Sequence, residues 1–373
     1  MSTVSDSLKE FGKSFLVAFY VPAMIFVLVH VYILGPFWLN DRLPAAKVLT
    51  ISSLSVSVDL TVLAELVILP LALAVLLAGL NDMIIILLEG RARWLKHGLL
   101  YPLTLRNRNR HKKLYGKLAT LRGVRSETQK QLSEAMSVKI RDELNNQIHD
   151  LNLQIDGLHQ VLEKREPRKR YPVNVNHVTP TDFGNAFAVA EEYSFERYGM
   201  DAVLFWPKLR QIIAEKSPNL SAQLVRQKTS LDLNVNMCMV LNVLFLELSS
   251  TLVQIAPPIN TFLAGLVISS LILAYLFFRA SVNAVEVLGD LIATSFDFYR
   301  GALLETFNLV PPPDIDSEQV VWVRLAAFIR RGEPFYYPQS ASRNGDRANK
   351  NKAPALGGVR IEFYGRSKED AKK

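Results

Sequence analysis

Three polar side chains inside long apolar stretches are the residues of this sequence best placed to do chemistry. Glu65 lies near one end of such a stretch, and Asn242 and Glu247 lie within another. An ionised carboxylate within a lipid bilayer is unfavourable and usually faces a bundle interior or water. Glu247 therefore predicts either a hydrogen bond that joins helices or a group that carries protons or ions.

The sequence shows none of the common catalytic or metal-binding patterns. It has no G-x-x-x-x-G-K-[ST] loop, no G-x-G-x-x-G turn after a strand, no H-E-x-x-H and no G-x-S-x-G. Its single cysteine, Cys238, excludes an internal disulfide and a cysteine-built metal site. We therefore expect a protein that is not an enzyme and has no cofactor and no metal.

The elements that hold these side chains are apolar runs long enough to cross a bilayer. Four spans are predicted, at about 14–35, 62–80, 235–256 and 261–278. The first resembles an uncleaved anchor, because it is too long for the apolar core of a signal peptide and no small-residue cleavage site follows. The last two are joined so closely that they must be adjacent and antiparallel.

The distribution of charge predicts the orientation of these spans. From Arg91 to Arg125 the chain has eleven Lys and Arg and no Asp or Glu. Because basic loops stay on the cytoplasmic side, both termini and residues 91–230 are expected in the cytoplasm. This predicts a multi-pass membrane protein with both termini on the cytoplasmic side.

Six basic residues of this run are candidates to face anionic lipid headgroups, since they follow the second span directly. They are Arg91, Arg93, Lys96, Arg106, Arg108 and Arg110. The rule that basic loops stay on the cytoplasmic side is by itself a sufficient explanation of these charges. Nucleic acid is a less favoured partner, because few aromatic residues interleave with the basic ones.

Residues 112–165 have the pattern of a coiled coil. Apolar residues repeat there at alternating spacings of four and three, and the register breaks before residue 144. The clearest seam is Ile148, Leu151, Ile155, Leu158 and Leu162. Two interpretations remain open: a helical hairpin within one chain, or a coiled coil that joins subunits into a homo-oligomer.

A corner follows, in which two short helices connect the cytoplasmic segment to the third span. Thr179 is expected to cap the first helix, with Pro180 at its first position, and Gly199 to end it. Asp201 can start the next turn. Six residues are expected to shape the corner: Arg197, Tyr198, Gly199, Asp201, Trp206 and Pro207.

The apolar run Val203–Trp206 in this corner is compatible with three roles. Packing of the cytoplasmic helices against the bundle is favoured, with Trp206 as a buried anchor. Contact with lipid and a ligand pocket are the alternatives. Pro207 disfavours helix at the residue before it.

The stretch TPTDFGNAFAVAEEYSFERYGMDAVLFWPKL, after LLEGRARW, resembles a group of uncharacterised bacterial multi-span membrane proteins. In that group, PT-x-x-GN, E-x-x-x-x-x-RYG-x-D and WP-x-L recur. The corresponding residues here are Pro180, Thr181, Gly184 and Asn185; Glu191 or Glu192, Arg197, Tyr198, Gly199 and Asp201; and Trp206, Pro207 and Leu209. The resemblance implies a bacterial inner membrane and supplies no activity.

The C-terminal part is predicted to leave the membrane as helix. Residues 281–338 form a cytoplasmic helical extension, in which the prolines at 311–313 end one helix and Ser317 caps another. Residues 339–373 are predicted to be mostly disordered, apart from the strand-like VRIEFYG.

The predicted fold class is therefore an all-α, four-span helical membrane protein. Residues 1–90 and 231–280 hold the spans, and residues 91–230 form a helical, partly coiled-coil cytoplasmic domain. The predicted function is a non-enzymatic component that assembles or senses through its cytoplasmic helices and acts as a membrane effector. The alternative is an oligomeric ion channel or transporter that uses Glu247.

Overall fold

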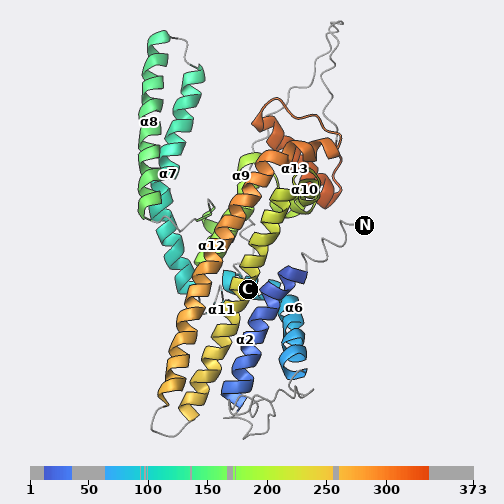
Figure 1. Ribbon diagram of the computed structural model, residues 1–373. Helices are drawn as coiled ribbons and strands as arrows, with labels where there is room; N and C mark the ends of the chain where they lie inside the picture. Colours follow the sequence, from blue (N-terminus) through green and yellow to red (C-terminus); the bar gives the residue numbers. More distant parts are fainter. Residues whose placement is uncertain are drawn as a thin grey trace, which may run out of the picture. The chain divides into compact units, whose positions relative to one another are not determined.

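The computed structural model describes residues 12–35, 64–92, 94–95, 98, 100–134, 137–165, 171–172, 174–254 and 260–335. Helices are the regular structure throughout these residues, which contain no strand, as expected for an all-α fold (Figure 1). The C-terminal tail, with its predicted disorder and its strand-like segment, lies outside the described residues.

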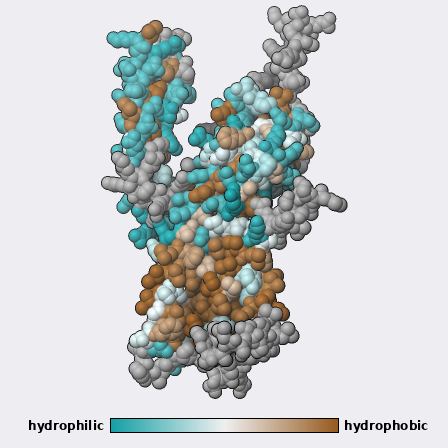
Figure 2. Space-filling model, viewed as in Figure 1, coloured by the Kyte–Doolittle hydropathy of each residue, from teal (hydrophilic) through white to brown (hydrophobic). Residues whose placement is uncertain are grey.

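Four helical segments are long and apolar enough to cross a membrane: Gly12–Leu34, Leu66–Glu89, Pro218–Gln254 and Thr261–Thr306. Large apolar side chains on them, such as Val75, Leu246 and Phe262, point outward and are exposed. Figure 2 shows a broad hydrophobic band on the surface of the molecule. A surface of this kind needs lipid around it, so the four-span prediction is supported.

The first two segments combine α-helix with wider π-helical turns. The first consists of η1 (Leu16–Tyr20), α2 (Val21–Val29) and η2 (His30–Leu34). The second consists of η3 (Ala64–Ile68) and α6 (Leu69–Glu89), so Pro70 lies just where the π-helical turn ends.

A polar contact compensates the proline of the first segment. Pro22 has no N–H, so the carbonyl four residues earlier, at Ala18, loses its usual helical partner. The side-chain amide of Asn236, on the third segment, donates to that carbonyl oxygen at 3.1 Å. A neighbouring helix thus gives this backbone oxygen a hydrogen-bond donor within the bundle.

The second segment extends beyond its predicted limit at residue 80. α6 continues through Asn81 and Asp82 to Glu89. Asn81 is buried, and its amide donates to Asp232 at 3.0 Å. A polar side chain that is bonded within the bundle does not mark the end of a span.

The last two apolar helices both extend beyond their predicted spans, and for the fourth span a helical continuation was expected. α11 (Pro218–Gln254) and α12 (Thr261–Thr306) lie side by side and antiparallel (Figure 1). α12 ends at Thr306, before the prolines at 311–313 that were expected to end it, and Asn308 follows with a positive φ of 56°.

The segment with the seven-residue pattern folds into two helices, α7 (Tyr101–Glu134) and α8 (Val138–Arg165), that pack against each other. Leu118 and Ile155 are buried between them. This supports the hairpin within one chain. Association of this segment between subunits remains a prediction.

Four shorter elements complete the described part: η5 (Val175–His177), α9 (Asp182–Tyr198), α10 (Ala202–Lys216) and α13 (Ile315–Arg331). Gly199 ends α9 with a φ of 67°, and Asp201 caps α10, both as predicted. Two predicted caps are wrong by a few residues. Thr181, not Thr179, caps α9, and Asp314, not Ser317, caps α13, because these side chains accept the free N–H groups of the first turns.

Candidate functional site

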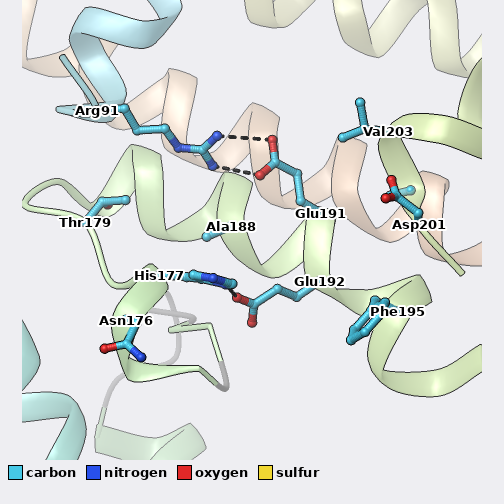
Figure 3. Close-up of a pocket in the computed structure, with 11 residues that line it drawn as sticks. Arg91, Asn176, His177, Thr179, Ala188, Glu191, Glu192, Phe195, Asp201 and Val203 are labelled. Carbon is cyan, nitrogen blue, oxygen red and sulfur yellow. Dashed lines mark hydrogen bonds and ion pairs between the residues drawn. The ribbon is translucent and has the colours of Figure 1, made fainter. Parts of the chain in front are cut away.

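The most developed polar site lies where α6 leaves its apolar stretch and meets α9. A cleft of about 380 Å³ opens there between charged and small apolar side chains (Figure 3). Its lining residues come from the end of α6, from η5, from α9 and from the start of α10. The residues that matter for the argument are Arg91, His177, Glu191, Glu192, Asp201 and Val203.

The backbone of α6 is joined directly to the first turn of α9. The hydroxyl of Thr181 accepts from the N–H of Gly184 at 3.0 Å and donates to the carbonyl of Leu88 at 2.8 Å. One side chain thereby serves the ends of two helices. Gly184 lies against the backbone of Glu89 so closely that a Cβ would clash with its carbonyl oxygen.

A second joint is ionic. The guanidinium of Arg91 donates to both carboxylate oxygens of Glu191, at 2.8 and 3.3 Å, and its Nε lies 3.0 Å from Glu89. Glu89 is 5% exposed, so Arg91 gives its carboxyl group a polar partner in a nearly dry place. Burial works to lower the pKa of Arg91, but the hydrogen bond to Glu191 and the nearby acids raise it overall. Arg91 therefore holds the end of the span to α9.

The outer rim of the cleft holds two further pairs. His177 contacts Glu192, whose second carboxylate oxygen is buried without a hydrogen bond. Asp201 accepts from the N–H of Leu204 at 3.0 Å and also pairs with Arg330 of α13. The charges of the described rim are thus largely matched to one another.

Residues at the end of α9 connect this helix to α12 and α13. The phenol of Tyr198 donates to Asp297 at 2.7 Å, and Arg300 lies 4.2 Å above the same ring. Burial, followed by the hydrogen bond to Asp297, raises the pKa of Tyr198 to about 12, so its proton stays in place at neutral pH. Gly199 lies against the backbone of Gln319, which leaves little room for a side chain.

The predicted lipid-facing basic residues divide into several groups. Arg91 pairs with Glu89 and Glu191, and its contact with anionic lipid remains a prediction. Arg108 donates to the carbonyl of Asn176, and Arg106 is exposed. Arg110 lies near Tyr171, whereas Arg93 and Lys96 lie outside the described residues.

The three polar residues predicted within the membrane lie in different surroundings. The side chain of Glu65 is outside the described part. Asn242 is exposed on its helix and donates to the carbonyl of Cys238 within the same helix. Glu247 faces His30 of the first span, with Nε2 and Oε2 at 3.1 Å. Sequence reasoning missed His30, although a lone histidine in an apolar run was a usable signal.

The corner is more helical than its sequence predicts. α10 continues through Pro207, whose missing N–H would have bonded to exposed Val203. Trp206 is only half-buried, against Phe296, which corrects its prediction as a fully buried anchor. Phe205 takes that role: it is 0% exposed and meets Trp322 edge-on, with ring centroids 5.1 Å apart.

The described contacts of this site hold helices in position and pair opposite charges. Within the described ranges, no three His, Cys, Asp or Glu side chains are grouped so that they could hold a metal ion. No family model, no curated protein and no solved structure matches the chain. Thr181, Gly184, Tyr198 and Gly199 all connect helices.

Proposed function

We propose that this chain is a non-enzymatic integral membrane protein that couples a helical cytoplasmic body to its membrane spans. In this function α9 and α10 respond to a cytoplasmic signal or partner, and the spans change in response. The proposal places the protein in a bacterial inner membrane with both termini in the cytoplasm, which rests on charge and on the resemblance to a bacterial group.

One observation carries the proposal: the joint between α6 and α9. α11 and α12 already continue without a break from apolar to polar surroundings. The joint adds a third connection through Thr181 and Arg91, which hold α9 to the end of α6. A displacement of α9 must therefore break this joint or move α6, whose Asn81 bonds to α11.

The native cysteine provides a test of this coupling. Cys238 is the single cysteine of the chain and is buried in α11, so its reaction with a membrane-permeant thiol reagent reports opening of the span bundle. We expect Arg91→Gln to increase the labelling rate several-fold, because it releases the joint. Arg324→Gln removes an exposed charge on α13 and should leave the rate unchanged.

Equal labelling rates in wild type and in Arg91→Gln would contradict the coupling. In that case the joint would only position α9. A parallel measurement of hydrogen exchange in α9 would verify that the substitution had loosened the joint at all.

Ion conduction is a second candidate function, favoured by the contact between His30 and Glu247 within the apolar band. Four spans are few for a transporter, so a conducting form requires oligomers. If this function is correct, purified protein in liposomes should carry a proton or cation flux, and Glu247→Gln should abolish it while the protein stays folded. Liposomes that stay as tight as protein-free ones would exclude this candidate.

A further inference from the structure

His30 and Glu247 bring two titratable groups together inside the apolar part of the protein. They lie on the first and third spans, and their Nε2 and Oε2 atoms are 3.1 Å apart. Both side chains are partly buried, at 29% and 26% exposure. Polar groups at such depth are held by each other or by backbone groups, because the hydrocarbon offers them no partner.

The tautomer of His30 follows from its other contact. Its Nδ1 lies 3.0 Å from the carbonyl oxygen of Phe26 on the same helix. A carbonyl oxygen can only accept, so Nδ1 must carry a hydrogen. In neutral imidazole the second nitrogen, Nε2, then has only a lone pair to present to Glu247.

This leaves the contact one proton short. The Oε2 atom of Glu247 is buried and has no well-aligned hydrogen bond. An ionised carboxylate opposite a neutral imidazole would place two acceptors 3.1 Å apart, which is unfavourable. One added proton resolves this, either as imidazolium with carboxylate or as imidazole with carboxylic acid.

We propose that His30 and Glu247 form a proton-binding site, whose one shared proton holds the first span against the third. The ligand of this site is the proton itself. The inference is independent of the proposed coupling function, and it does not require that the protein conducts protons.

Among the described side chains of the surrounding spans, other titratable groups have contacts of their own or lie at another level. Lys228 and Asp232 form a separate pair, and Asp232 lies fifteen residues from Glu247, about 22 Å along the helix. Asp82 follows Asn81, which bonds to Asp232 at that distant level. Tyr32 packs with Val27, Val31 and Leu73. Tyr275 of α12 is 62% exposed.

The site has a one-sided dependence on pH. Loss of the shared proton at alkaline pH leaves two acceptors facing each other, and the contact opens. A second proton at acidic pH does not break it, because Nε2–H of the imidazolium still donates to the carbonyl of the acid. Where the folded pair keeps its proton but the unfolded chain has lost it, the folded state binds one proton more, so its stability falls as pH rises until the pair itself loses the proton.

Thermal unfolding across pH tests the proposal on the full chain in lipid nanodiscs. Glu247→Gln and His30→Gln each supply an amide N–H that makes the contact without a titrating proton. The melting temperature of wild type should fall by roughly 2–4 °C more than that of either variant as the pH becomes alkaline. Glu305→Gln, an acid-to-amide change at a surface pair with Lys216, should follow wild type.

If the melting temperatures of wild type and of a folded variant change with pH in the same way, the proposal is wrong. Nitrogen-15 NMR of the wild type gives an answer even if both variants fail to fold. The signal of His30, identified by its contact with the labelled Phe26 carbonyl, should show hydrogen on Nδ1 at every pH. The proton shared with Glu247 should be lost only at alkaline pH. Hydrogen on Nε2 with a bare Nδ1 would also overturn it.

Discussion

Replacing Phe205 with alanine should lower the free energy of unfolding by about 3–5 kcal/mol. Its ring is completely buried against Trp322, whose indole N–H donates to Glu318 at 3.1 Å. Truncation would open a cavity between α10 and α13, and the hydrogen-bonded Trp322 cannot move freely to fill it. Thermal or denaturant unfolding in detergent measures the loss.

The neighbouring residue supplies a matched control for this experiment. Trp206 is larger but only half-buried, so Trp206→Ala should cost clearly less than Phe205→Ala. The reverse order would show that Trp206 is the packing anchor after all. Equal and small losses would show that α10 does not depend on either ring.

Replacing Gly184 with alanine should detach the start of α9 from the end of α6, at a cost of roughly 2–5 kcal/mol. The new Cβ would meet the backbone oxygen of Glu89, which cannot rotate away. Relief of the clash would also break the bond from Thr181 to Leu88. Hydrogen exchange in the first turn of α9 should rise with the fall in melting temperature.

Gly116→Ala is the control for the change of residue type itself. Gly116 lies within α7, exposed, with open space around the position of a Cβ. Alanine is the better helix former, so this variant should gain about 0.5–1 kcal/mol. A similar response of the two glycines would argue against a tight joint at Gly184.

The helical elements were predictable because they depend on local signals. The length of the apolar runs indicated the four spans. Gly199 and Asp201 marked helix ends through backbone rules that need no knowledge of the fold. Val282, Val285 and Phe296, spaced three and eleven residues apart along α12, are all buried.

The site was less predictable because its contacts join residues far apart in the sequence. Arg91 and Glu191 are 100 residues apart, and nothing local shows that they meet. His30 and Glu247 each looked like an isolated polar residue for the same reason. Trp206 was chosen as the anchor on size, but the helical turn directs Phe205 to the interior instead.

The bond between Asn236 and Ala18 has a consequence for the order in which the protein is made. The two residues are 218 positions apart, so at 5–20 residues per second the ribosome completes Asn236 roughly 10–45 s after Ala18. During that interval the first span has already been synthesised, but its proline-freed carbonyl has no amide from the third span. Water, lipid headgroups or the insertion machinery must solvate that carbonyl until Asn236 arrives.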